Sequence, residues 1–261
     1  MHNFEFVKPS SVAEAVKALG AEGAQPLSGG QTLLPTMKQR LAAPGLLVSL
    51  TGISEIRGVC LADGVVSVGG ATAHAVVAKE AARYFPALAA LAGGIGDPAV
   101  RSRGTIGGSL ANNDPSACYP AAVLGAGAMV LTNKRKIAAD DFFQGMFTTA
   151  LDEGEIITGV DFPVPEKAAY VKFEQPASRF ALCAVFVAKF GHKVRVAVTG
   201  ASGDGVFRWT EAEAALATNF SRDAIAGLSL SGDGMISDLH GTAAYRAAMV
   251  KVMTSRAVSA C

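Results

Sequence analysis

The first fifty residues alternate short apolar runs with turns that contain glycine. Phe4–Val7 and Leu46–Leu50 are compact runs of branched or aromatic residues, and they predict strands. Ser11 and Glu14 have the spacing of a capping box, which predicts a helix that ends at Gly20. A strand predicted over 24–27 leads through a glycine turn into a second helix. The apolar positions of that helix recur at helical spacing, as Leu33, Leu34, Met37 and Leu41.

The middle of the chain predicts a hairpin followed by small helices. The segments 58–61 and 65–68 are strand-like, and Asp63-Gly64 between them is the strongest short hairpin signal. Ala-rich segments predict helices at 73–84 and 86–92, before the glycines of 93–96 interrupt the pattern. A short helix near 120–125, a hairpin around 133–136 and a strand at 155–161 complete this part.

Spaced prolines at Pro163 and Pro165 mark the expected domain boundary, because proline interrupts both helices and strand ladders. Three strand-like runs follow, at 169–174, 182–190 and 194–200, and then helical segments near 211–217, 222–227 and 241–256. Strands followed by helices predict the α+β class. We therefore expect a first domain over 1–165 and a small second domain over 166–261, with a three-stranded sheet and helices.

Composition narrows the class of protein. Lys and Arg total 23 against 22 for Asp and Glu, and a net charge of +1 argues against a nucleic-acid-binding protein, which would need a basic surface. No uninterrupted apolar run is long enough for a membrane span, and the N-terminus lacks the pattern of a signal peptide. The four cysteines are scattered, so we expect a cytoplasmic protein with reduced thiols and no metal of its own.

Glycine is abundant, and 16 of its 29 occurrences lie between Gly20 and Gly108. Two glycine loops stand out there, Ser28-Gly29-Gly30-Gln31-Thr32 and Thr105-Ile106-Gly107-Gly108-Ser109. Glycines before a helix let several backbone amides converge on a phosphate, and the helix dipole favours the anion. Two such loops suit a dinucleotide, although each one alone is equally well explained as a tight turn. Neither loop has a Walker or a G-x-G-x-x-G sequence, which disfavours an ordinary nicotinamide-binding fold.

The two loops, with Asn112-x-Asp114-Pro115 behind the second, resemble those of the FAD-binding medium subunits of molybdenum hydroxylases. This family includes carbon monoxide dehydrogenase and xanthine dehydrogenase. The resemblance continues through Asp97-Pro98-x-x-Arg101 and Phe162-Pro163-x-Pro165 to Tyr170-x-Lys172-Phe173. It implies a two-lobed FAD-binding domain of the PCMH, or vanillyl-alcohol-oxidase-like, type with lobes of about 1–56 and 57–165. A C-terminal domain of the carbon monoxide dehydrogenase type is implied for 166–261.

The resemblance also implies where FAD binds. The pyrophosphate would lie on the backbone of the first loop, and the second loop would form the opposite wall. Two further polar residues would contact the polar part of the cofactor, two residues would lie near the ring system or the ribityl chain, and Phe180 would cover the flavin. The implied residues are Ser28, Gly29, Gly30, Gln31, Thr32, Leu33, Thr105, Ile106, Gly107, Gly108, Ser109, Asn112, Asp114, Ile157, Lys172 and Phe180.

In the family, electrons pass from a substrate at molybdenum through two [2Fe–2S] clusters to this flavin and then to an external acceptor. The chain lacks cysteines to hold a cluster, so an iron–sulfur small subunit and a molybdopterin large subunit are the implied partners, in a heterotrimer or its dimer. No side chain is a candidate catalytic residue. The alternatives are a free-standing flavin reductase or oxidase of similar fold, and a non-catalytic scaffold that has lost FAD.

Three positions qualify the resemblance. The family usually has Asn where Ser109 stands and often has Asp where Cys118 stands, so two contacts to the cofactor are altered. The segment 175–179 replaces a basic loop beside the expected flavin face.

His74 is either a site of covalent flavin attachment or, as we expect, a histidine at the start of a helix near a solvated edge.

Overall fold

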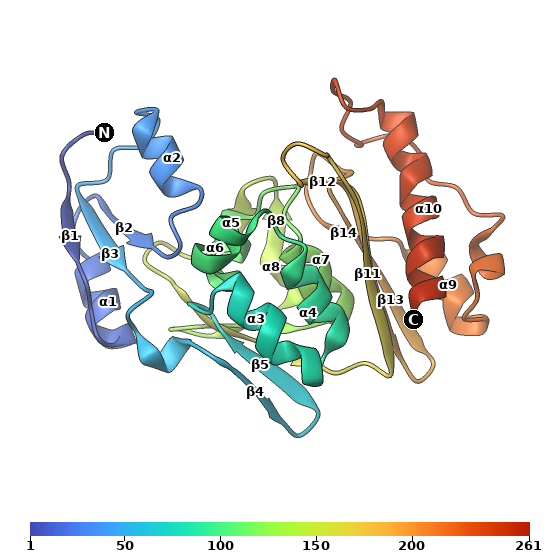
Figure 1. Ribbon diagram of the computed structural model, residues 1–261, viewed down its shortest axis with the longest axis horizontal. Coiled ribbons are helices and arrows are strands. Elements are labelled where there is room, and N and C mark those ends of the chain that lie inside the picture. Colours follow the sequence, from blue (N-terminus) through green and yellow to red (C-terminus); the bar gives the residue numbers. More distant parts are fainter.

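The computed structural model describes residues 1–261, which form three bodies side by side (Figure 1). A small lobe contains the N-terminus, a helix-rich body lies in the centre, and a long sheet backed by the last helices forms the far side. The α+β class and the two-lobed first domain are confirmed. None of the helices is both long and apolar enough to cross a lipid bilayer.

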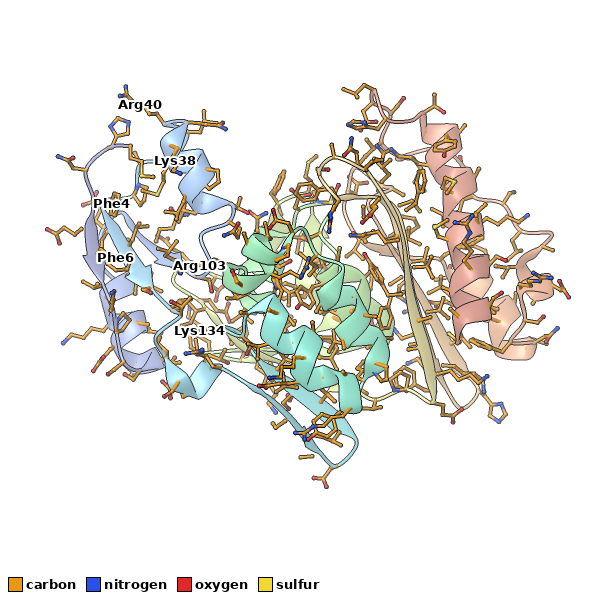
Figure 2. All side chains as sticks on the ribbon, viewed as in Figure 1. Phe4, Phe6, Lys38, Arg40, Arg103 and Lys134 are labelled. Carbon is orange, nitrogen blue, oxygen red and sulfur yellow. The ribbon has the colours of Figure 1, made fainter.

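The N-terminal lobe is a three-stranded parallel sheet in the order β1-β3-β2. Its elements are β1 (Glu5–Val7), α1 (Val12–Leu19), β2 (Ala24–Leu27), α2 (Leu33–Lys38) and β3 (Leu46–Ser49). The Ser11 hydroxyl accepts a hydrogen bond from the Glu14 amide, as the capping box predicts, but the Glu14 carboxylate turns back to Ser10 instead of Ser11. Phe4 and Phe6 extend from the edge of this sheet into solvent (Figure 2).

The central body is built on a five-stranded antiparallel sheet in the order β4-β5-β10-β6-β7. Its strands are β4 (Val59–Ala62), β5 (Val65–Gly69), β6 (Met129–Thr132), β7 (Lys136–Ala138) and β10 (Ile157–Pro163), and β8 (Phe143–Gly145) and β9 (Thr148–Thr149) pair separately. Its helices are α3 (His74–Glu80), α4 (Pro86–Gly93), α5 (Pro98–Arg103), α6 (Ile106–Asn112), α7 (Tyr119–Ala126) and α8 (Ala139–Phe142), with short 3₁₀ helices η1 (Ser54–Ile56) and η2 (Ala81–Arg83).

The segment after Gly93 is more helical than its glycines predict, because it carries α5 and α6. Asp97 caps α5 by accepting a hydrogen bond from the Val100 amide, and Thr105 caps α6 by accepting one from the Gly108 amide. The second glycine loop is therefore the first turn of a helix. The single helix expected at 73–84 is divided into α3 and the 3₁₀ helix η2.

The C-terminal part is an antiparallel sheet in the order β11-β12-β13-β14. It contains β11 (Lys167–Glu174), β12 (Ala181–Phe190), β13 (Lys193–Thr199), β14 (Phe207–Arg208), α9 (Thr210–Thr218), η3 (Arg222–Ile225) and α10 (Ala243–Ala260). The two-residue strand β14 makes four strands where we expected three, and the helix expected at 222–227 is the 3₁₀ helix η3. Helices α9 and α10 cover one face of the sheet around Trp209, the only tryptophan of the chain, which is 2% exposed.

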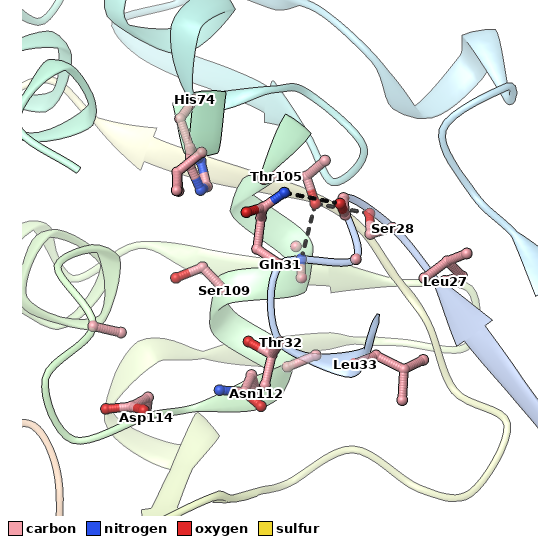
Figure 3. A pocket seen from close by; sticks show the side chains of 18 of the residues that line it. Leu27, Ser28, Gln31, Thr32, Leu33, His74, Thr105, Ser109, Asn112 and Asp114 are labelled. Atoms are coloured by element: carbon pink, nitrogen blue, oxygen red, sulfur yellow. Dashed lines mark hydrogen bonds between the residues drawn. The ribbon is translucent and has the colours of Figure 1, made fainter. Parts of the chain in front are cut away.

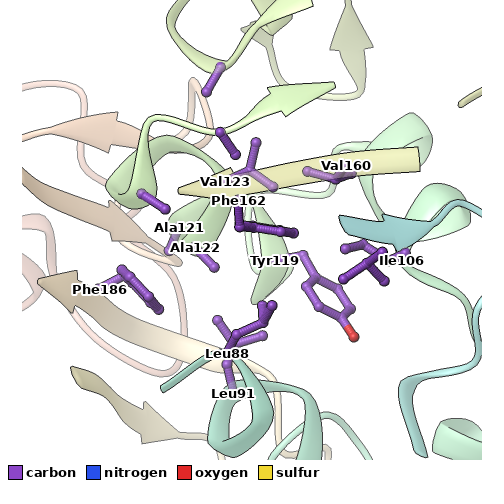
Figure 4. Close-up of a cluster of buried hydrophobic side chains, with 14 of the residues drawn as sticks. Leu88, Leu91, Ile106, Tyr119, Ala121, Ala122, Val123, Val160, Phe162 and Phe186 are labelled. Carbon is purple, nitrogen blue, oxygen red and sulfur yellow. The ribbon is translucent and has the colours of Figure 1, made fainter. Parts of the chain in front are cut away.

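The inner face of this sheet joins the core of the central body. Phe186 of β12 packs edge-on against Phe85, with ring centroids 6.0 Å apart, and Phe85 packs in the same way against Phe162. Figure 4 shows Phe186 and Phe162 in this shared core. Helix α7 approaches the sheet closely at Gly125, where an added Cβ would lie 2.8 Å from the Phe186 ring. This packing fixes α7, and with it the segment that leads from α6 to α7.

Hydrogen bonds also join the sheet to this segment. The Thr199 hydroxyl lies 3.0 Å from the Pro115 carbonyl oxygen and 2.8 Å from that of Ala117, and it is fully buried. The Gly200 amide donates to the same Pro115 oxygen. The C-terminal sheet therefore holds the backbone of 115–117 in place from behind.

Candidate functional site

A cavity of about 770 Å³ opens between the N-terminal lobe and the central body. Its volume lies within the range of roughly 300–1,000 Å³ that small-molecule sites occupy. Both glycine loops line it, together with residues from β10 and from the β11–β12 loop. The predicted site residues on its wall are Ser28, Gly29, Gly30, Gln31, Thr32, Leu33, Thr105, Gly107, Gly108, Ser109, Asn112, Asp114, Ile157 and Phe180.

The first glycine loop presents four consecutive backbone amides without a protein partner, those of residues 29–32. The loop joins β2 to α2, and Gly30 turns it with a φ of +70°, a conformation that favours glycine. Only its carbonyl groups are used, since Gly30 accepts from the Leu34 amide and Gly29 from the Gln31 side chain. Backbone amides in folded proteins are nearly always paired, so a row of four free donors at a cavity indicates a site for oxygen acceptors of a ligand.

The second glycine loop has a different role, because its amides are already bonded. Ile106 donates to the Thr72 carbonyl, Gly107 to Gly70 and Gly108 to the Thr105 hydroxyl. Glycine is needed at position 107 for space, since an added Cβ would lie 2.7 Å from the Gly70 oxygen. The first loop therefore offers free backbone donors to the cavity, and the second loop, whose amides are bonded within the protein, forms part of its wall.

The two loops touch each other directly (Figure 3). The Ser28 and Thr105 hydroxyls lie 2.7 Å apart. An added Cβ on Gly29 would lie 2.1 Å from the Arg103 carbonyl oxygen and 2.6 Å from the Gly104 α-carbon. The lobes thus meet backbone to backbone at this point, which sets the position of the free amides relative to the opposite wall.

Two predicted site residues, Ile106 and Lys172, do not line the cavity. Ile106 is fully buried in the central core. The Lys172 ammonium donates to the carbonyl oxygens of Gly94 at 2.6 Å and Arg179 at 2.9 Å, and it pairs with Glu174. Lys172 therefore ties the loop that carries Phe180 to the end of α4.

Comparison with known proteins gives the family. The family described as "FAD binding domain in molybdopterin dehydrogenase" matches residues 2–165. The chain belongs to the FAD-binding medium subunits of the molybdenum hydroxylases. It is 33% identical to the carbon monoxide dehydrogenase medium chain of Hydrogenophaga pseudoflava, over 98% of this chain and 96% of the relative. It is 32% identical to the nicotine 6-hydroxylase medium subunit of Paenarthrobacter nicotinovorans, over 97% of this chain and 95% of the relative.

Solved structures support the same fold. Carbon monoxide dehydrogenase from Oligotropha carboxidovorans has a chain that superposes with a TM-score of 0.88 at 31% identity, over 99% of this chain and 97% of that one. Quinoline 2-oxidoreductase from Pseudomonas putida 86 gives a TM-score of 0.88 at 26% identity, over 99% and 96%. The cofactor of this FAD-binding subunit is FAD, and the chain is part of an oxidoreductase.

The residues present in this FAD-binding subunit fit the cofactor. The four free amides offer donors to a pyrophosphate, and a side chain at Gly29 would displace them, because its Cβ would collide with the backbone of Arg103 and Gly104. On the far wall, the Asp114 carboxylate accepts from the Ser116 amide at 2.8 Å, in a turn that directs both residues toward the cavity. Ser109 and Cys118, where the sequence departs from its family, both line the cavity. Burial raises the pKa of the Cys118 thiol, so it is protonated at neutral pH.

Glu155 also borders the cavity, and the sequence pattern gave no indication of it. The hydrogen bond from Arg135 is the main cause that lowers the pKa of Glu155 to about 2. The Glu155 carboxylate also accepts hydrogen bonds from the Thr132 hydroxyl and the Asp152 amide. It therefore stabilises the segment before β10 and is not free to bind a ligand.

His74 is a further residue that sequence reasoning misjudged. It is 5% exposed and lines the cavity, whereas we expected a histidine near a solvated edge. Burial is the main cause that lowers its pKa to about 4, and the charge of Arg101 adds to the effect. Helical spacing could have indicated its burial, because His74, Val77 and Ala81 follow the i, i+3, i+7 spacing of one helix face, and both Val77 and Ala81 are fully buried.

Proposed function

We propose that this subunit holds FAD between its two lobes and passes electrons from [2Fe–2S] clusters of a small subunit to an external acceptor. The observation that carries the proposal is the row of four unpartnered amides at residues 29–32, which lie on a cavity of dinucleotide size. They would hold the pyrophosphate. When bound, the flavin supplies the redox chemistry, and the chain supplies position and surroundings.

The remaining wall residues take the other parts of FAD in this proposal. Asn112 and Asp114 would bind its polar part, Ile157 would contact the ring or the ribityl chain, and Phe180 would cover the flavin from the C-terminal domain. Lys172 supports this cover from behind, through its bonds to the Arg179 and Gly94 carbonyls. We place the FAD domain at 1–165 and the covering domain at 166–261, which meet at the link between β10 and β11.

The assembly that we propose is a heterotrimer, or its dimer, with an iron–sulfur small subunit and a molybdopterin large subunit. The relatives named above are themselves medium chains and medium subunits. Substrate would meet molybdenum on the large subunit, so this chain carries no catalytic side chain. All four cysteines are free, which supports a reducing compartment such as the cytoplasm.

Reconstitution tests the cofactor part of the proposal. The full chain, stripped of flavin and mixed with FAD, should recover flavin absorbance with one FAD per chain. Gly30→Leu should abolish binding, because the new side chain meets Leu34 from a backbone with positive φ. Gly227→Leu is the matched control, since nothing lies within 4 Å of that position. Absence of FAD from the reconstituted wild-type chain would refute the proposal.

Purification of the native complex tests the partner part. Tagged chain isolated from its own cells should bring two further subunits, and metal analysis should find iron and molybdenum with the complex. A chain that purifies alone and turns over substrate with its flavin would instead be a free-standing reductase or oxidase.

A further inference from the structure

His74 lies beside the contact between the two loops. A methyl group on Gly104 would lie 2.5 Å from His74 Nε2, so the imidazole edge rests on the Gly104 backbone. Gly29, the first residue of the four-amide row, also lies against Gly104, since an added Cβ on Gly29 would be 2.6 Å from the Gly104 α-carbon. The Gly104 carbonyl accepts the His74 amide at 2.9 Å, which fixes the start of α3 at this place. The imidazole and the start of the four-amide row therefore lie against the same glycine and line the same cavity.

The imidazole has no protein partner for its polar atoms. Nδ1 is enclosed and unbonded, and no hydrogen bond contributes to the pKa of this residue. The nearest aromatic neighbour is Tyr119, whose ring centroid is 5.3 Å away. Figure 3 shows the ring extending from α3 into the cavity, on the same side as Gln31 and Ser109. A side chain that is 95% buried, unpaired and directed into a cavity needs an acceptor or a donor from a ligand.

Burial, with the charge of Arg101 as a second cause, lowers the pKa of His74 and keeps the ring neutral. The Arg101 guanidinium is the cation that contributes, and it is held by the carbonyl oxygens of Ile95 and Gly96 at 3.0 and 2.7 Å. A neutral imidazole has one N–H and one bare nitrogen. Because an orphaned buried N–H is rarer than an unfilled acceptor, the proton belongs on Nε2 and the bare nitrogen is the enclosed Nδ1.

We propose that His74 is a cofactor-binding residue whose Nε2–H donates a hydrogen bond, through the shared cavity beside Gly104, to a pyrophosphate oxygen of FAD held on the four free amides. The inference rests on the proposed FAD site. It gives the second wall a donor that its own backbone lacks, since the amides of Ile106, Gly107 and Gly108 are bonded within the protein. It also makes His74 a ligand by hydrogen bond and not a site of covalent attachment.

Three variants of the full chain test the assignment. His74→Leu removes both ring nitrogens and should weaken FAD binding about ten- to hundredfold, the range expected for a hydrogen bond to a charged group. His74→Gln places an amide N–H near the Nε2 position and should restore most of the affinity. His74→Asn places it near the Nδ1 position and should bind as weakly as the Leu variant, so the Gln and Asn pair remains informative if Leu disturbs folding. His192→Leu, at an exposed turn, is the control and should bind as wild type.

Two further measurements separate the outcomes. The midpoint potential of bound FAD should be the same in wild type and in His74→Gln and His74→Asn, because a pyrophosphate contact is equal in oxidised and reduced cofactor. All flavin should leave the wild-type protein on acid precipitation. Equal affinity of Gln and Asn variants, a changed midpoint potential, or flavin retained in the precipitate would each overturn the assignment. If the wild type bound no FAD, the proposed function itself would fail.

Discussion

Gly29→Ala should be the most informative single substitution in the chain, because it adds only a methyl group at the contact of the two lobes. That methyl would lie 2.1 Å from the Arg103 carbonyl oxygen and 2.6 Å from the Gly104 α-carbon. Both are backbone atoms, and Gly104 is held by its own hydrogen bonds to Val100 and His74. Gly29 itself does not have a positive φ, so the cost comes from space alone.

The magnitude follows from the movement that the methyl forces. An ordinary carbon–oxygen contact needs more than 1 Å of additional separation here, and overpacking of this kind costs about 1–3 kcal/mol. Parting the loops also loses the Ser28–Thr105 hydroxyl pair, with a net contribution of about 1 kcal/mol. The free energy of unfolding should therefore fall by about 2–4 kcal/mol. FAD affinity should fall at least tenfold, because the shifted amides lose one or more charge-assisted hydrogen bonds worth about 1.5–3 kcal/mol each.

Urea unfolding followed by circular dichroism measures the first effect, and FAD titration of the refolded chain measures the second. Gly227→Ala supplies the control, because nothing lies within 4 Å of that residue and its φ is not positive. A Gly29→Ala chain as stable as the control, or one that binds FAD as wild type does, would refute the backbone contact that we describe.

Three further predictions concern His74, Thr199 and Lys172. The pKa of His74 is about 4 in the folded chain against 6.5 ordinarily, so the unfolded chain binds the proton first as pH falls. As the pH falls from 6.5 to 4, the free energy of unfolding of the flavin-free chain should decrease by about 3 kcal/mol more in wild type than in His74→Leu, as measured by urea unfolding. An equal dependence of the unfolding free energy on pH in the two proteins would contradict the burial of His74. Thr199→Val removes the hydroxyl donor from the Ala117 carbonyl, while the Pro115 carbonyl keeps the Gly200 amide, and it should cost about 1–3 kcal/mol of unfolding free energy while Thr199→Ser stays near wild type. Lys172→Met should loosen the Phe180 loop and increase iodide quenching of the bound flavin, with a smaller loss of FAD affinity than Gly29→Ala; unchanged quenching would count against its supporting role.

Local signals made most of the fold predictable. The strands with Asp63-Gly64 between them, the capping residue Ser11 and the branched runs after Pro165 each depend on neighbours within a few residues, and each gave the right element. Helices α5 and α6 were missed because glycine usually ends helices. At Gly107 it is instead required by the closeness of Gly70, a contact that only the folded chain brings about.

The site was predictable in position but only partly in detail. The first glycine loop and most of the opposite wall could be located from motifs. Whether a backbone amide is free or hydrogen-bonded depends on residues far away in the sequence. The amide of Gly107 donates to the Gly70 carbonyl, whereas the amides of residues 29–32 have no such partner, and the sequence does not show this difference. The polar end of Lys172 is similarly fixed by carbonyls of Gly94 and Arg179, which no spacing rule indicates.

The burial of Trp209 has a spectroscopic consequence. Because it is the only tryptophan and lies in the core between β13, α9 and α10, ultraviolet emission from tryptophan reports the packing of the C-terminal sheet alone. Flavin emission would come from the cavity between the lobes. When one sample is heated, tryptophan emission would therefore follow unfolding of the C-terminal domain and flavin emission would follow loss of the site between the lobes. Comparison of the two midpoint temperatures would show whether the two parts unfold together.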